Sequence, residues 1–309
     1  MSDHPAHLRK EIEFIARSPK FSLEKDLILS ASTRLQLDEA LAKVRHHRTI
    51  YETWNFASVD PMGTGTVLNF YGPTGTGKTM AAEAFAGTLG LQFIHVGIAE
   101  IESKFMGETA KNIQRAFQAA HRSSAIILFD EADTLLGKRL TSVTQGIDNE
   151  VNSMRSTLLI ELERFEGIAI FATNFAQNYD EAFRSRITHH LRFELPDAAA
   201  RSKLWRKMIL PTIPLRGDLE SIVHECTVLS EGFSGREIRT CMRLSLPKTL
   251  LESERTGCAA ELTLSHLIES ITQVRTASKD VAAPARERVT TDATVVRSLL
   301  GIANPEGEM

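Results

Sequence analysis

Short, almost wholly apolar runs alternate with amphipathic segments through the central part of the chain. Runs of this kind are typical of strands buried on both faces of a parallel sheet. The sequence predicts such strands at residues 66–70, 91–96, 124–129 and 168–172. Because strands and helical segments alternate, we expect an α/β fold in which helices sandwich a parallel sheet and ligands bind at the carboxyl ends of the strands.

The hydrophobic pattern changes after Pro196, where helical spacing replaces the short apolar runs. A small all-helical subdomain is therefore expected to follow the α/β domain. Its predicted helices span residues 199–209, 219–230, 235–251 and 264–274. Pro247 is expected to end the third of these helices early or to kink it, because proline lacks the N–H that a helix interior requires.

These patterns divide the chain into successive parts. Residues 1–26 form a short N-terminal segment, residues 27–196 the large α/β domain, residues 197–278 the helical subdomain and residues 279–309 a C-terminal tail. The tail is rich in charge, Ala, Thr and Pro, a composition that favours poor order.

The amino-acid composition disfavours several classes of protein but does not identify a function. The 309 residues carry 36 basic and 39 acidic side chains, which gives a net charge of −3. A charge of this size and sign does not favour binding to nucleic acid or to an anionic membrane. The three cysteines stand far apart, which suits a reducing compartment. The N-terminus lacks the apolar core of a secretory signal, and no apolar run approaches the roughly 20 residues that cross a bilayer. We therefore expect a soluble, cytoplasmic protein.

The strongest motif is a phosphate-binding loop between the first predicted strand and a helix. It fits the pattern G-x-x-x-x-G-K-[ST], in which glycines let backbone N–H groups turn towards phosphates. Lys78 is predicted to reach the β and γ phosphates of a nucleotide, and Thr79 to bind Mg²⁺. The predicted nucleotide-binding residues of this segment are Gly72, Pro73, Thr74, Gly75, Thr76, Gly77, Lys78, Thr79 and Met80.

A second motif places carboxylates at the end of another buried strand. Residues 126–133 read Ile-Ile-Leu-Phe-Asp-Glu-Ala-Asp. Asp130 is predicted to hold Mg²⁺ through water, and Glu131 to act as the general base that polarises the attacking water. A strand that ends in Asp-Glu is by itself often only a capped turn; the phosphate loop upstream favours the catalytic interpretation.

Together, residues 72–79 and 130–133 resemble the paired nucleotide motifs of the AAA ATPases, and the resemblance extends from about residue 27 to 274. It implies a P-loop NTPase fold with a helical lid, with ATP and Mg²⁺ as the nucleotide and the metal. It also implies that Asn174, which follows the predicted strand at 168–172, orients the hydrolytic water near the γ phosphate.

The resemblance also assigns roles to arginines. Arg186 matches the arginine finger that reaches into the neighbouring subunit's site, and Arg184 matches a second, looser contact. Arg236 corresponds to the family's second sensor, where some branches carry arginine and others alanine. An arginine supplied in trans requires a homo-oligomer, which in this family is most often a hexamer.

A loop after the second predicted strand resembles the pore loop of protein-translocating AAA rings. The predicted pore-loop residues are Lys104, Phe105, Met106 and Gly107. An exposed aromatic beside a basic residue can grip an extended polypeptide, and glycine lets such a loop move. The alternative is an ordinary connection with Phe105 buried.

We therefore expect an ATPase that remodels a partner protein by threading it through a central pore. Residues 234–239 and the predicted helix from Asn149 onward are similar to the pachytene checkpoint ATPases, which remodel HORMA-domain proteins and have bacterial relatives in antiphage operons. Residues 1–26 leave no room for the N-terminal adaptor domain of the eukaryotic branch, so a general AAA chaperone with another client stays open. Two further alternatives are a ring-shaped motor or loader acting on nucleic acid, which the net charge disfavours, and a non-motor nucleotide switch or kinase.

Overall fold

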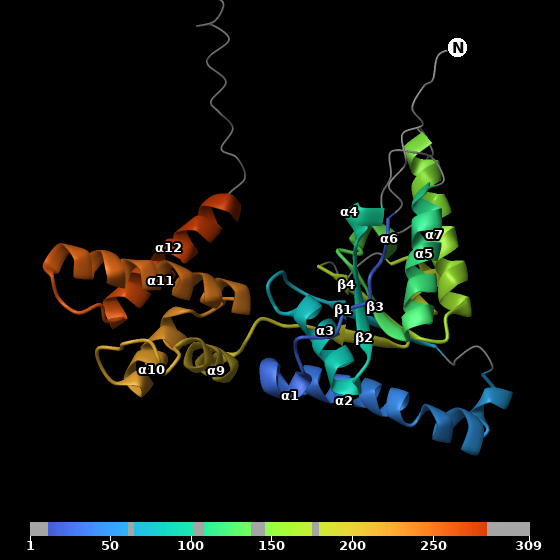
Figure 1. Ribbon diagram of the computed structural model, residues 1–309, viewed down its shortest axis with the longest axis horizontal. Coiled ribbons are helices and arrows are strands. Elements are labelled where there is room, and N and C mark those ends of the chain that lie inside the picture. The colour runs from blue at the N-terminus through green and yellow to red at the C-terminus, as the bar shows by residue number, and fades with distance from the viewer. Residues whose placement is uncertain (1–11, 61–64, 102–107, 137–145, 175–178, 283–309) are drawn as a thin grey trace, which may run out of the picture. The chain divides into compact units, whose positions relative to one another are not determined.

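The computed structural model describes residues 12–60, 65–101, 108–136, 146–174 and 179–282. Its contacts divide the chain into two compact units, each taken by itself below (Figure 1). Unit 1 comprises residues 1–208 with 230–238, and unit 2 comprises residues 209–229 with 239–309. Within the described parts of the chain, none of the helices is long and apolar enough to cross a bilayer.

Unit 1 is built on a five-stranded sheet in which all neighbouring strands are parallel. Its order is β2-β3-β4-β1-β5. The strands are β1 (Thr66–Tyr71), β2 (Gln92–Gly97), β3 (Ala125–Asp130), β4 (Ile168–Thr173) and β5 (His189–Arg192). The predicted α/β fold with a parallel sheet is confirmed. Sequence analysis missed β5, because an edge strand with one buried residue in the pattern His-His-Leu-Arg carries little apolar signal.

Two hydrophobic clusters cover the two faces of the sheet. Alternate strand residues such as Val67, Ile127 and Phe171 pack under α5 (Glu108–Ser123) and α7 (Gly146–Arg164), which lie side by side in Figure 1. The residues between them, such as Leu68 and Leu128, pack under α2 (Ala31–Arg45) and α3 (Lys78–Leu89). Because both faces of the sheet's central strands are buried, β3 and β4 are almost wholly apolar. The shorter elements of unit 1 are α1 (Leu23–Asp26), η1 (Thr49–Thr53), η2 (Phe56–Ser58), α4 (Ile98–Ile101), α6 (Asp133–Leu136) and α8 (Glu181–Arg184).

The N-terminal segment contacts this layered core directly. Arg17 exchanges two backbone hydrogen bonds of 2.9 Å with Phe93, at the outer edge of β2. Its guanidinium also binds both carboxylate oxygens of Glu83 on α3, at 2.8 and 2.9 Å. Residues near position 17 therefore cover the open edge of the sheet and brace the helix that follows the phosphate loop.

The helices beyond Pro196 occur close to the predicted ranges. They are α9 (Ala198–Met208), α10 (Leu219–Leu229), α11 (Gly235–Thr256) and α12 (Leu264–Ala282). Pro247 was expected to end the third helix early or to kink it; the early end is wrong, because α11 continues past Pro247 to Thr256. Buried packing holds the helix together there: the Ser245 hydroxyl lies 2.9 Å from the Ser270 hydroxyl of α12, and Met242 and Thr249 are buried on either side of Pro247.

Candidate functional site

The phosphate loop leads from the carboxyl end of β1 to the first turn of α3. Gly72, Gly75 and Gly77 have φ angles of 142°, 80° and 99°, a region that side chains strongly disfavour. A Cβ on Gly72 would overlap the carbonyl oxygen of Phe193. The helix begins at Lys78 without a side-chain cap, so its first backbone N–H groups remain available to an anion.

Lys78 is buried, and its ammonium donates to three oxygens. The acceptors are Gly72 O at 2.7 Å, Pro73 O at 2.9 Å and Asn174 Oδ1 at 2.9 Å. Burial lowers the pKa of Lys78, while the negative charges of Asp130 and Asp133 oppose that shift. The ammonium thus joins the phosphate loop to the end of β4.

Asp130 ends strand β3 beside the start of α3. Its Oδ2 accepts a hydrogen bond of 2.8 Å from the Thr79 hydroxyl and lies 3.1 Å from His95 Nε2. Burial disfavours the charged carboxylate, but the hydrogen bonds from His95 and Thr79 outweigh burial, so the pKa of Asp130 lies below its ordinary value. A hydroxyl and an ionised carboxylate are oxygen groups of the kind that hold Mg²⁺ beside nucleotide phosphates, so these residues fit the predicted metal site.

Glu131 turns the chain out of the sheet directly after Asp130. It has a φ of 57°, in the left-handed region that only a few per cent of non-glycine residues occupy. Its N–H donates to Asp130 Oδ1 at 3.0 Å, and the next N–H, from Ala132, donates to Ala172 O at 2.9 Å. The Glu131 side chain is exposed, so solvent water can reach its carboxylate.

Hydrogen bonds to Asp133 hold Thr173 and the backbone of Asn174 in place. Asp133 Oδ1 accepts hydrogen bonds from the Thr173 hydroxyl and from the Asn174 backbone N–H, the latter at 3.1 Å. Asn174 Oδ1 also accepts a bond of 3.2 Å from the Thr74 hydroxyl in the phosphate loop. Since an ammonium can only donate, the amide atom that faces Lys78 must be the oxygen.

Arg236 lies in the first turn of α11, and its backbone N–H donates to Gly75 O at 3.2 Å. A capping box fixes this turn: Ser234 N donates to Glu237 Oε2 at 2.7 Å, and Glu237 N donates to Ser234 Oγ at 3.3 Å. The segment that carries Arg236 therefore reaches the phosphate loop within unit 1.

Of the two candidate finger arginines, Arg184 ends α8 and Arg186 follows it two residues later. Asp180 caps this helix by accepting from Ala182 N at 2.9 Å. Arg184 is exposed. Arg186 donates to Ala182 O at 2.8 Å and forms an ion pair with Glu163 of α7. Its intrachain partners therefore come from α7 and α8.

The predicted pore-loop residues, Lys104, Phe105, Met106 and Gly107, lie outside the described residues.

Sequence reasoning assigned no role in the site to His95, Asp133 or Thr173, although Asp133 lies in the motif at residues 130–133. His95 gave a signal that could have been used, because β2 and β3 were both predicted and neighbouring parallel strands end at the same edge. The support from Asp133 depends on the particular turn after β3, and no spacing rule predicts it.

A cavity lies elsewhere in unit 1. It measures about 390 Å³ and is lined at the amino ends of the strands by Thr66, Ala125 and Ile168, among others. Open α/β sheets bind ligands at the carboxyl ends of their strands. The cluster around Lys78 and Asp130 is therefore the candidate site.

A phosphate loop after β1, with an Asp-Glu pair at the end of β3 in the same parallel sheet, defines a P-loop nucleotide-binding domain. The profile of the ATPase family associated with various cellular activities (AAA) matches residues 68–195. Residues 68–195 therefore form an AAA ATPase domain.

Individual relatives agree with that assignment. The ATPase family AAA domain-containing protein FIGL1 of Arabidopsis thaliana is 32% identical over 201 residues, which are 62% of this chain and 29% of that protein. The 26S proteasome subunit RPT4 of Saccharomyces cerevisiae is 32% identical over 178 residues, or 55% of this chain and 40% of that protein. The chain thus spans less than half of the length of either relative.

The fold has a solved counterpart. A crystal structure of the FIGL-1 AAA domain in complex with ADP superposes with a TM-score of 0.62 and 18% identity, covering 94% of each chain. The similarity extends past the 68–195 match and includes most of the helical region.

Proposed function

We propose that the chain is an ATP-driven protein remodeller that works as a ring, most simply a hexamer. The observation that carries the proposal is the contact between Lys78 and Asn174, at 2.9 Å, next to the bond between Thr79 and Asp130, at 2.8 Å. These bonds gather the phosphate loop, the Asp-Glu strand and β4 at one edge of the sheet.

The roles of these residues follow from their chemistry. Residues 72–80 bind the phosphates of ATP through backbone N–H groups and the Lys78 ammonium. Thr79 and Asp130 would hold Mg²⁺, and the bound ion would supply positive charge that offsets the charge developing on the phosphates. Glu131 takes the proton of the attacking water, and Asn174 orients that water.

Ring assembly completes the site in this proposal. Arg186, with Arg184 as a looser second contact, would stabilise transition-state charge in the neighbouring subunit, and Arg236 would contact phosphate in its own subunit. A heterologous interface of this kind closes into a ring when its rotation divides the circle. Hydrolysis would move the helical lid and, with it, Phe105 along a central pore.

The nature of the relatives supports a protein client. One is named as a subunit of the 26S proteasome, and net charge of −3 does not favour a nucleic-acid track. A finer proposal is that the client is a HORMA-domain protein in bacterial antiphage signalling in the cytoplasm, because residues 234–239 resemble the pachytene checkpoint branch. An affinity pull-down with the ATP-trapped Glu131→Gln ring tests this client directly.

Two variants test the remodelling function. Glu131→Gln should bind ATP, lose hydrolysis by about 10²- to 10⁴-fold and accumulate as ATP-bound rings, because the base is gone while the binding residues remain. Phe105→Ala should keep ATP hydrolysis and lose unfolding of a client. Normal turnover by Glu131→Gln would refute the assigned base; full remodelling by Phe105→Ala would refute the threading mechanism.

A further inference from the structure

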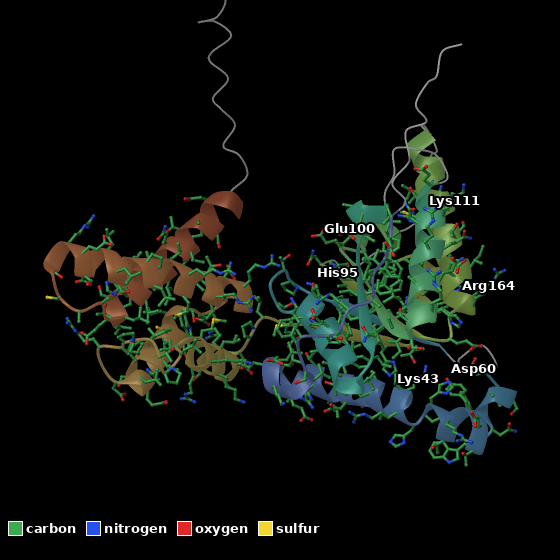
Figure 2. All side chains as sticks on the ribbon, in the orientation of Figure 1. Lys43, Asp60, His95, Glu100, Lys111 and Arg164 are labelled. Atoms are coloured by element: carbon green, nitrogen blue, oxygen red, sulfur yellow. The ribbon has the colours of Figure 1, made fainter. Side chains whose placement is uncertain are left out.

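Strand β2 brings His95 to the carboxylate that ends β3. The two strands pair in parallel, with His95 opposite Leu128 and Gly97 opposite Asp130. His95 Nε2 lies 3.1 Å from Asp130 Oδ2. The His95 side chain is 37% exposed, so shortening it opens no cavity in the core, and Figure 2 labels it on β2 near Glu100.

The bonds around Asp130 determine which atom carries the proton. An ionised carboxylate only accepts hydrogen bonds, so His95 Nε2 is the donor in this contact. Oδ2 also accepts from the Thr79 hydroxyl, whereas Oδ1 accepts from the Glu131 N–H. Each carboxylate oxygen offers about two acceptor positions. Oδ2 is therefore filled, and Oδ1 keeps one position for a further donor.

On the basis of the ATPase function proposed above, we propose that His95 is a positioning residue for the metal. By donating to Oδ2, His95 holds the Asp130 carboxylate in one orientation and leaves Oδ1 to accept from a Mg²⁺-bound water. Partners that orient metal-binding groups typically change metal affinity by 10- to 100-fold. His95 makes this contact without touching the metal itself.

A metal-directed role differs measurably from a structural one. If His95 acts through Asp130 on the metal, its removal weakens only the Mg²⁺-dependent part of nucleotide binding. If His95 merely supports the fold, nucleotide binding falls equally with Mg²⁺ and with EDTA. Glutamine provides the conservative variant, because its amide retains an N–H donor on a side chain of similar reach.

The experiment follows binding of a fluorescent ADP analogue to the purified full chain while MgCl₂ is titrated, with a parallel series in EDTA. His95→Ala should raise the Mg²⁺ midpoint by about ten-fold and leave the affinity in EDTA unchanged. His95→Leu, which fills similar volume without a donor, should do the same. His95→Gln should return the midpoint to within about three-fold of wild type, and His121→Ala, at an exposed histidine of α5, should not move it.

A double-mutant cycle with Asp130→Asn completes the test. If His95 acts through Asp130, adding His95→Ala to Asp130→Asn should cause little further change in the Mg²⁺ midpoint. An unchanged midpoint in both His95→Ala and His95→Leu overturns the positioning role alone, as does an equal loss in EDTA. A wild-type chain that binds no nucleotide even with Mg²⁺ overturns the proposed ATPase function, and the positioning role with it.

Discussion

The Lys78 ammonium lies 2.9 Å from Asn174 Oδ1, which joins the phosphate loop to the end of β4. In the proposed function, a γ phosphate that binds Lys78 would compete with this oxygen for the same N–H protons, and Asn174 would respond to the nucleotide that is present. Asn174→Ala should keep ATP affinity within a few-fold and lower kcat by about 10²-fold, because one positioned polar group near the transition state is removed. Steady-state kinetics check this, with exposed Asn55→Ala as the control. A loss confined to KM would contradict the assigned role.

Arg186 forms an ion pair with Glu163 within its own chain. This pair must break before Arg186 can contact a neighbouring subunit. The pair is partly exposed, and exposed ion pairs contribute at most about 1 kcal/mol. Releasing Arg186 for a neighbouring subunit therefore costs little. Glu163→Ala should change ATP turnover by no more than about five-fold, whereas Arg186→Ala should lower it by about 10³-fold.

Mixing two inactive variants tests whether Arg186 acts across subunits. Lys78→Ala lacks the phosphate contact and Arg186→Ala lacks the finger, so each alone should be inactive. Random co-assembly should restore complete sites at about a quarter of the interfaces. Activity that stays absent in mixed rings, with assembly verified by light scattering, would argue that Arg186 serves only its own chain.

Gly72 is the glycine of the phosphate loop that the fold constrains most tightly. Gly72→Ala adds a Cβ that overlaps Phe193 O at a φ of 142°, so it should destabilise unit 1 by about 3 kcal/mol or more. Gly90→Ala at the end of α3 is the matched control: its φ is 71° and its Cβ would meet open space, so the loss should be about 1 kcal/mol.

Tryptophan fluorescence during urea unfolding measures this difference, because Trp54 and Trp205 both belong to unit 1. Equal shifts of the unfolding midpoint in the two glycine variants would show that backbone strain alone matters, and that the close approach of Phe193 does not.

Much of the fold was predictable because burial on both faces leaves a continuous apolar signal. Strands β1 to β4 were placed to within one residue for this reason. The helices after Pro196 were found from their helical spacing instead, and α12 ends eight residues beyond its predicted end at 274. Strand β5 was not predicted, since its only buried residue is Leu191. Pro247 misled the prediction because contacts with α12 outweigh a local preference against proline in helices.

The sequence predicted the motif residues of the candidate site but not the contacts between its strands. Lys78, Thr79, Asp130 and Glu131 belong to contiguous motifs, so spacing alone found them. The bond from His95 to Asp130 depends on the pairing of β2 with β3, and local sequence patterns do not predict the order of strands in a sheet. The left-handed backbone of Glu131 is likewise a consequence of the turn into α6.

The cysteines allow a prediction that is independent of any nucleotide chemistry. Cys226 and Cys241 are buried, whereas Cys258 is exposed. Burial raises the pKa of the Cys226 thiol to about 12, so almost none of it is the reactive thiolate near neutral pH. Under native conditions a thiol reagent such as iodoacetamide should modify Cys258 rapidly and the two buried cysteines only after unfolding.

Cys258→Ser should abolish the fast phase in a mass-spectrometric time course. Rapid labelling of Cys226 in the folded chain would mean that α10 opens readily, because a buried thiol reacts only as fast as its surroundings open.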